Sequence, residues 1–184
     1  DYSMVTEAVY YDDFFIIRSE KSGWTHLYQY SNSGSLMKQL TTGNWNVTAY
    51  YGYDALKRTF YFQTTQVSPL DRTISKVDAK GVVTPIVKGA GTYSAIFSKD
   101  MKHYIQNFCD ATTPNQYRVI SVANGKTVRD LELNEQYAAK YTGVDIPKRE
   151  FFQFQSEGHM LNGYMIKPLD FNPNKKYPVI MSQY

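Results

Sequence analysis

A chain of 184 residues is long enough for one domain, or for one domain and part of another. Its formal net charge of +3 comes from scattered basic residues, and the single basic pair beside an aromatic, Lys175 and Lys176, is too little for the clustered stripe of a nucleic-acid-binding protein. No apolar run approaches the ~20 residues that span a bilayer, and no signal peptide is expected in these residues.

The first predicted elements are two short strands rich in aromatic residues, at residues 8–13 and 14–20. Aromatic residues make up 16% of the sequence, including 17 tyrosines, and strands favour tyrosine and phenylalanine, so the composition predicts an all-β fold. Asp12 and Asp13 lie where the two strands meet. Neighbouring residues of a strand point to opposite faces, so we assign these aspartates to a turn rather than to a metal site.

A hairpin follows, and it repeats twice further along the chain. Each copy is an alternating strand, a polar turn with one glycine, and a second alternating strand; glycine supplies the positive φ that a tight hairpin turn needs. The hairpins span residues 27–40, 74–86 and 118–131, with turn glycines at Gly34, Gly81 and Gly125. The spacing of these glycines, roughly 44 to 47 residues, matches the period of a four-stranded propeller blade.

Two inner strands precede each hairpin, and together they complete a blade of four antiparallel strands. The second and third inner pairs are predicted at residues 47–54 and 58–65, and at residues 92–100 and 102–108. The sequence thus predicts three blades, over residues 4–43, 44–89 and 90–132. Three blades are too few to close a propeller, which typically uses about four to eight, so the chain is expected to be a piece of a longer one. Its open blade edges are expected to favour self-association, which light scattering would detect.

The pattern changes after the third blade. Residues 134–141 predict one short helix with Asn134 as its N-cap, and a linker follows. A hairpin that turns at Glu157 and Gly158 is expected next, then a loop rich in proline and asparagine, and finally a buried strand at residues 179–183. This tail does not share the blade period, so it predicts the start of a different domain.

Two short runs of residues, one in blade 1 and one that leads into blade 2, form a motif. The motif positions are Ser19, Glu20, Gly23, Trp24, His26, Leu27 and Tyr28, followed by Leu40, Thr41, Gly43, Trp45 and Val47. In this order and spacing they resemble the dipeptidyl peptidase IV family, within the prolyl oligopeptidase clan of serine peptidases, which carries a Ser-Glu-x-Asp-Gly-aromatic-x-His-Leu-Tyr run that leads to a Leu-Thr-x-Gly-x-Trp-Glu-Val run. Residues 68–72 and 150–184 match two further runs, the second of which enters the catalytic domain of the family. The chain departs from the family at Ser22, Asn46 and Glu157, where many relatives have aspartate, glutamate and aspartate.

The resemblance implies a domain plan and a reaction. Residues 1–145 would be the C-terminal blades of an eight-bladed propeller, and residues 146–184 the first strands of an α/β-hydrolase peptidase domain. The longer protein would remove N-terminal dipeptides with proline or alanine second, through a serine acyl-enzyme, and the propeller would admit chain ends and exclude folded proteins. The family further implies peptide partners with a free N-terminus, a homodimer, and export to the bacterial periplasm or cell envelope.

Tyr184 is the one candidate catalytic residue. In the family, a strand that ends in tyrosine, followed by a small residue and Gly-Pro, places the tyrosine hydroxyl at the oxyanion hole. Residues 175–184 match the family up to this tyrosine. The resemblance therefore implies that Tyr184 donates a hydrogen bond to the tetrahedral intermediate of the longer protein. The alternative is a strand-end tyrosine with only a packing role.

Other chemistry is not expected from this sequence. It has no Gly-x-Ser-x-Gly nucleophile elbow, so the chain alone is expected to be inactive, and it has neither a metal-binding motif nor a cofactor-binding loop. His26 and His103 are each expected to make a hydrogen bond within a blade, and His159 is expected to be solvated. Cys109 is expected to pack as a small hydrophobic residue.

Two alternatives stay open at this point. One is a propeller binding module whose hydrolase domain is degenerate and non-catalytic. The other is a tripeptidyl or acylaminoacyl peptidase of the same clan. By the family pattern, the residues that separate these readings, namely the catalytic triad and the clamp for the substrate amino terminus, lie outside this sequence.

Overall fold

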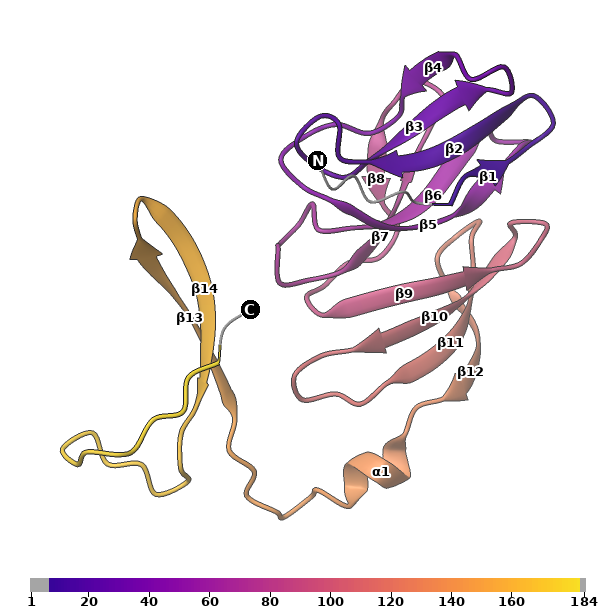
Figure 1. The fold of residues 1–184 in the computed structure, drawn as a ribbon. Helices are drawn as coiled ribbons and strands as arrows, with labels where there is room; N and C mark the ends of the chain where they lie inside the picture. The colour runs from indigo at the N-terminus through magenta and orange to yellow at the C-terminus, as the bar shows by residue number, and fades with distance from the viewer. Residues whose placement is uncertain (1–6, 183–184) are drawn as a thin grey trace. The chain divides into compact units, whose positions relative to one another are not determined.

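The structure, a computed structural model, describes residues 7–182 of the chain. Within these residues it contains three four-stranded antiparallel sheets, one short helix and a two-stranded hairpin (Figure 1). The chain divides into two compact units, Asp1–Asn134 and Glu135–Tyr184. No helix among the described residues is long and apolar enough to cross a membrane.

The three sheets are the predicted blades, and each is a simple meander in which consecutive strands pair. Blade 1 contains β1 (Val9–Tyr10), β2 (Phe14–Ser19), β3 (His26–Ser31) and β4 (Leu36–Gln39). Blade 2 contains β5 (Val47–Asp54), β6 (Thr59–Thr64), β7 (Thr73–Val77) and β8 (Val83–Pro85). Blade 3 contains β9 (Thr92–Phe97), β10 (His103–Cys109), β11 (Gln116–Ser121) and β12 (Thr127–Glu132). The prediction of an all-β fold built from four-stranded blades is confirmed.

The turn glycines behave as their positions in the repeat predict. Gly34, Gly81 and Gly125 have φ angles of 87°, 91° and 69°, in the left-handed region that side chains with a Cβ adopt only at a cost. Each lies between the third and fourth strands of its blade. The repeated hairpins are therefore the last two strands of the three blades, as predicted.

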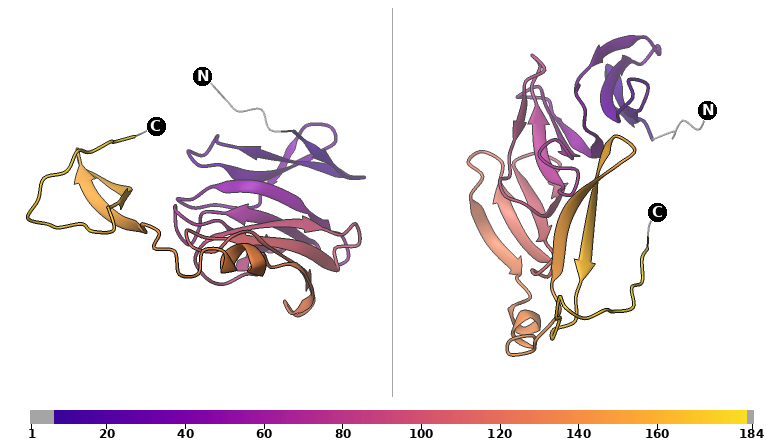
Figure 2. Two further views of the ribbon diagram at one scale, coloured as in Figure 1. Left: turned by 90° about the horizontal axis from the view of Figure 1, so that it is seen from below. Right: turned by 90° about the vertical axis from the view of Figure 1, so that its left-hand side faces the viewer.

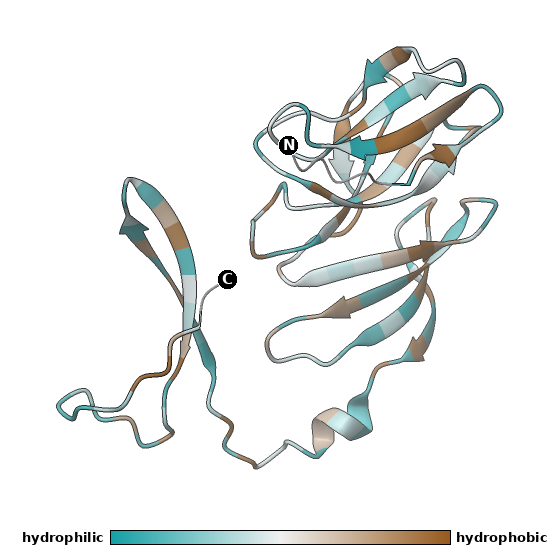
Figure 3. Ribbon diagram, viewed as in Figure 1, coloured by the Kyte–Doolittle hydropathy of each residue, from teal (hydrophilic) through white to brown (hydrophobic). Residues whose placement is uncertain are grey.

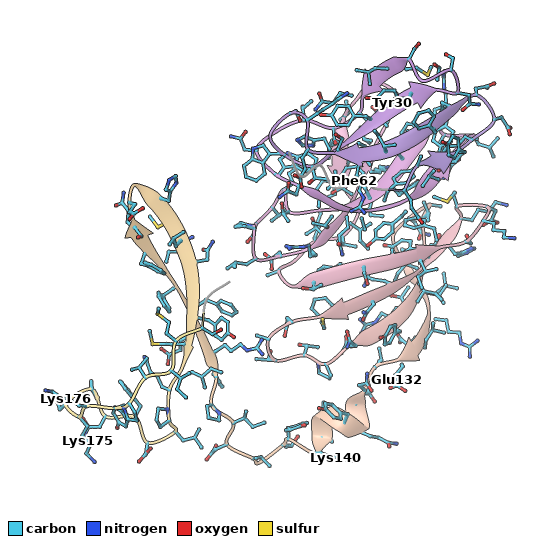
Figure 4. All side chains as sticks on the ribbon, in the orientation of Figure 1. Tyr30, Phe62, Glu132, Lys140, Lys175 and Lys176 are labelled. Carbon is cyan, nitrogen blue, oxygen red and sulfur yellow. The ribbon has the colours of Figure 1, made fainter. Side chains whose placement is uncertain are left out.

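The core of the first unit lies between neighbouring blades, which follow one another side by side (Figure 2). Between blades 1 and 2, apolar side chains of both sheets pack together, and Phe62 at the centre is 0% exposed (Figure 4). The apolar run of β2 supplies part of this layer (Figure 3). A second cluster, which includes Ile74 and Tyr104, fills the space between blades 2 and 3. Burying these side chains supplies most of the favourable free energy of folding.

Strand β5 contributes to both layers because consecutive residues of a strand point to opposite faces. Tyr50 and Tyr53 pack against the cluster between blades 1 and 2, whereas Tyr51 packs against the cluster between blades 2 and 3. Tyr51 lies on the ring of Phe97, with 5.9 Å between ring centroids. One strand thus connects two neighbouring cores.

The second unit consists of α1 (Glu135–Ala139), the hairpin of β13 (Arg149–Ser156) and β14 (His159–Ile166), and a loop. The hairpin turns at Glu157 and Gly158, whose φ angles of 48° and 83° are those of the two-residue turn that the sequence predicted. Lys175 and Lys176 lie together in the exposed loop after β14 (Figure 4).

Two details of the predicted tail are wrong. Asn134 precedes α1, but its φ is 55° and its side-chain amide donates to the carbonyl of Asn115 in the β10–β11 loop, so it stabilises that loop rather than capping the helix. The predicted buried strand at residues 179–183 is not a strand over residues 179–182, and Ile180 is 100% exposed. A strand needs a neighbouring strand to satisfy its backbone groups, and none pairs with this segment among the described residues.

Candidate functional site

Four of the motif residues, His26, Thr41, Gly43 and Trp45, meet where blade 1 leads into blade 2, and we call this group the joint. His26 at the start of β3 is 1% exposed, and its ring faces the segment that leads from β4 into β5. Nδ1 of His26 lies 3.0 Å from Oγ1 of Thr41, and Nε2 lies 3.0 Å from the carbonyl oxygen of Gly43. The prediction that His26 makes hydrogen bonds within the blade region is confirmed.

The direction of each hydrogen bond follows from its partners. The backbone N–H of Leu27 donates to Oγ1 of Thr41 at 3.0 Å, so the Thr41 hydroxyl is free to donate its own proton to Nδ1 of His26. A carbonyl oxygen only accepts, so Nε2 of His26 carries the proton that the Gly43 carbonyl receives. The network is complete with a neutral, Nε2-protonated imidazole.

Trp45 extends this joint into blade 2. Its ring meets the His26 ring edge-on, with centroids 4.9 Å apart and an interplanar angle of 88°. On Phe62 the same indole ring is stacked, with centroids 6.2 Å apart and planes only 7° from parallel. His26 of blade 1 and Phe62 of blade 2 are therefore joined through one indole ring.

Gly43 must be glycine for two reasons. Its φ of +127° lies in a region that favours glycine, and an added Cβ would lie 2.4 Å from Nε1 of Trp45. The sequence alone shows neither the positive φ of Gly43 nor its close approach to Trp45. The Gly-x-Trp spacing of the motif is thus explained by close packing of the indole against the backbone.

We expect Gly43→Ala to destabilise the first unit by about 3 kcal/mol, the sum of backbone strain and of overpacking against Trp45. The matched control is Gly34→Ala, since Gly34 also has a positive φ, +87°, but no atom within 4 Å of an added Cβ. The control should lose only about 1 kcal/mol, from strain alone. Urea midpoints at constant m-value measure both losses. Equal losses in the two variants would contradict the packing of Trp45 on Gly43.

Burial lowers the pKa of His26 below its ordinary value of 6.5, because a charged imidazole would lose its hydration; the hydrogen bond to the Gly43 carbonyl opposes the shift in part. The ring is accordingly neutral at pH 7. A buried neutral histidine already bound on both nitrogens is an anchor for the chain rather than a catalytic base.

A second contact between the same blades was not visible in the sequence. The hydroxyls of Tyr11 and Tyr50 lie 2.7 Å apart and share a hydrogen bond. Burial raises the pKa of both phenols, so both stay protonated. The two residues lie far apart in the repeat, and no spacing signal links them.

A small pocket of about 230 Å³ lies beside the joint, between the end of β2 and the start of β5. Arg18 reaches across it and donates to the carbonyl of Thr48, while the Asn46 side chain accepts from the backbone N–H of Thr25 at 2.9 Å. These polar groups connect the two blades. The pocket lining contains no serine–histidine pair. Within residues 7–182, no group of three histidine, cysteine, aspartate or glutamate side chains could hold a metal ion.

Of the other residues singled out in the sequence, His103, Cys109 and His159 are described by the structure, and no hydrogen bond joins their side chains. Tyr184, the candidate oxyanion-hole donor, lies outside the described residues. The prediction of a hydrogen-bonded imidazole is wrong for His103, which is exposed at the β9–β10 turn and bonds to Ser98 through its backbone. His159 is exposed, as predicted, and Cys109 is a free, partly buried thiol.

Comparisons with known proteins place this geometry in a family. Residues 4–115 match the family described as the dipeptidyl peptidase IV (DPP IV) N-terminal region. A probable dipeptidyl peptidase 4 of Trichophyton verrucosum is 33% identical over 177 residues, which cover 94% of this chain and 23% of the relative. A probable dipeptidyl peptidase 4 of Emericella nidulans is 30% identical over 175 residues, which cover 93% of this chain and 22% of the relative. The chain therefore spans about a quarter of the length of these relatives.

Solved structures agree with the sequence comparisons. The crystal structure of Porphyromonas gingivalis dipeptidyl peptidase 4 superposes on 93% of this chain with a TM-score of 0.87 and 33% identity, using 24% of its own length. A putative dipeptidyl aminopeptidase IV from Bacteroides ovatus superposes with a TM-score of 0.79 at 22% identity, which supports the fold alone. The chain belongs to the dipeptidyl peptidase IV family, and most of its first unit is part of that family's N-terminal region.

Proposed function

We propose that this chain is a segment of a longer serine peptidase that removes dipeptides from the free N-terminus of peptides, with proline or alanine as the second residue. One observation carries the proposal: 94% of the chain aligns at 33% identity with a probable dipeptidyl peptidase 4. The substrate preference and the acyl-enzyme route come from the family resemblance.

Blades 1 to 3 would form part of the propeller wall through which a peptide end reaches the catalytic domain. The packing of the blades supports a rigid role, because adjacent sheets share an apolar core and are further tied by the hydroxyl pair of Tyr11 and Tyr50. A wall of this kind selects by size. It admits a flexible chain end and excludes a folded protein.

Residues 146–184, which make up most of the second unit, would be the start of the peptidase domain, and the hairpin of β13 and β14 supports this assignment. Phe151 and Tyr164 form a cross-strand pair on one face, while Phe154 and Leu161 form a pair on the other, and all four side chains are exposed. A strand pair in water normally exposes apolar side chains on one face at most. The hairpin is thus suited to the interior of a larger sheet.

The test is hydrolysis of a Gly-Pro chromogenic substrate by the longer protein that contains this chain and by the 184-residue chain itself. We expect turnover by the longer protein that a serine-directed phosphonate abolishes, and no turnover by the chain alone, since its sequence has no nucleophile elbow. A longer protein that folds but never hydrolyses the substrate would contradict the proposal and favour a non-catalytic propeller. Phosphonate-sensitive turnover by the chain alone would contradict the role assigned to the segment.

A further inference from the structure

We propose that His26 is an acid-sensitive latch: its neutral imidazole fixes residues 40–46, the segment that leads from blade 1 into blade 2, and its protonation releases that segment. We call residues 40–46 the link. The inference goes beyond the proposed function, because it concerns how the propeller part responds to acid and not how a substrate is cleaved.

The latch rests first on a network that is satisfied only when the ring is neutral. Leu27 donates its backbone N–H to Thr41, Thr41 donates its hydroxyl proton to Nδ1 of His26, and Nε2–H of His26 donates to the carbonyl of Gly43. Each of these three donors has an acceptor within the network. Two of the three partners, Thr41 and Gly43, belong to the link.

Protonation of Nδ1 reverses the hydrogen bond between His26 and Thr41. The ring nitrogen becomes a donor, so it now points a proton at the Thr41 hydroxyl, and the hydroxyl must turn its own proton elsewhere. Thr41 is 1% exposed, and water does not reach it to accept that proton. A buried donor without an acceptor, beside a buried charge, disfavours the closed link.

Charged groups around the ring do not offset the new charge. The link itself, residues 40–46, contains no ionisable side chain, and β6 presents Phe62 through Trp45. On the other side, β2 places Ser19 opposite His26. The β2–β3 loop carries Glu20 and Lys21, both exposed.

These two loop residues have other partners. The Glu20 carboxylate accepts from the hydroxyl of Thr25 at 3.3 Å, and the Lys21 ammonium lies 4.0 Å from the centroid of the Tyr28 ring. Burial therefore dominates the lowered pKa of His26, with no carboxylate among its causes.

The expected opening is centred on residues 41–43, because the other hydrogen bonds of the link lie mainly at its two ends. At the first end, Leu40 donates its backbone N–H to the carbonyl of Leu27 at 2.8 Å, and Gln39 donates its side-chain amide to the carbonyl of Thr41 at 3.0 Å. At the other end, the Asn46 side chain accepts from the backbone N–H of Thr25 at 2.9 Å, and the backbone of Asn46 donates to Oγ1 of Thr65 and accepts from the N–H of Thr65, both at 3.0 Å. Trp45 lies against the imidazole edge. When the His26 ring moves away, the backbone around Gly43 loses its hydrogen bond and the Trp45 ring loses its edge-on contact with the imidazole.

The direction of the pH effect follows from the lowered pKa. In the open link His26 regains its ordinary pKa of 6.5, whereas in the closed link its pKa is lower. Between those two values only the open form binds the proton, so the opening constant should rise about tenfold for each pH unit as the pH falls. Above pH 6.5 the titration of His26 should no longer change the opening constant.

The test uses the 184-residue chain between pH 7.5 and pH 5. Nitrogen-15 spectra of the His26 ring report its tautomer and its titration, and amide exchange at Leu27, corrected for the intrinsic pH dependence, reports the opening. In a Trp24→Phe background, Trp45 is the single tryptophan, so its fluorescence reports the same event. We expect an Nε2-protonated ring at pH 7.5 and faster exchange at Leu27 below pH 6.5.

Three variants separate the latch from a merely structural role. His26→Gln should abolish the pH dependence of exchange, and His103→Gln, at an exposed histidine in blade 3, should leave it unchanged. If His26→Gln does not fold, Thr41→Val serves instead: it removes both the donor to Nδ1 of His26 and the acceptor of the Leu27 N–H, so exchange at Leu27 should be fast even at pH 7.5, while Thr41→Ser should retain slow exchange at pH 7.5 and its rise below pH 6.5. An Nδ1-protonated ring at pH 7.5, or exchange at Leu27 that does not change with pH after correction, would overturn the proposal.

Discussion

Replacement of Phe62 by alanine should cost the first unit about 3–5 kcal/mol of its free energy of unfolding. Phe62 is 0% exposed at the centre of the core between blades 1 and 2, and its ring supports the indole of Trp45. Removing the ring leaves a cavity that neighbouring strands, fixed by their hydrogen-bonded register, fill poorly. Small domains are stable by only about 5–15 kcal/mol, so this single change should remove a large share of the total.

Both tryptophans lie in the first unit, so urea unfolding followed by tryptophan fluorescence measures this loss. The control is Leu56→Ala, since Leu56 at the β5–β6 turn is 95% exposed. Its effect should stay within about 0.5 kcal/mol. A Phe62→Ala variant that unfolds at nearly the same urea concentration as the control would mean that the core between the blades is not where the structure has it.

The second large effect is expected in the longer protein, where Tyr184→Phe should lower kcat by about 10²–10³-fold, with little change in KM. The reason is that the phenol is proposed to donate to the oxyanion of the tetrahedral intermediate, and this charge is absent from the bound substrate. Loss of such a donor weakens binding of the transition state and not of the ground state.

Tyr164→Phe is the matched control for this measurement, because it removes a phenol from the hairpin of β13 and β14 at a residue with no proposed catalytic role. It should keep the kcat of the unchanged protein. Thermal melting of both variants separates a catalytic effect from a folding defect. If the Tyr184→Phe variant folds and retains its kcat, the tyrosine has only a packing role.

The blades could be predicted from the sequence because each of their signals is local. Alternation of side chains predicts a strand, and the glycines at Gly34, Gly81 and Gly125 predict the turns. The structure confirms the strands and the positive φ of each glycine. The same local logic predicted the turn at Glu157 and Gly158.

What the sequence could not reveal depends on contacts between distant residues. His26 and His103 have similar strand contexts, yet only His26 faces a neighbouring segment, because His103 lies beside a turn that leaves its ring in solvent. Met101 looks like an exposed turn residue, yet its φ is 54° and its side chain is only 7% exposed. Its methyl group would lie 3.3 Å from a Cβ added at Gly52 of blade 2.

The candidate site was predictable only in part, for a related reason. The motif positions of His26, Thr41, Gly43 and Trp45 were visible as a string, but their function as one packed joint follows only from their distances. The strand predicted at residues 179–183 failed because its apolar residues were read as buried, and burial requires a neighbour that the described residues do not supply.

The two-sided strand β5 has a consequence for recombination between relatives. Because Tyr50 packs toward blade 1 and Tyr51 toward blade 3, transplanting blade 2 alone from another member of the family would replace half of two cores at once. A chimera should tolerate a crossover best where both halves of one core come from the same parent. The unit to exchange between relatives is therefore the pair of facing sheet surfaces that share one core, rather than a single four-stranded blade.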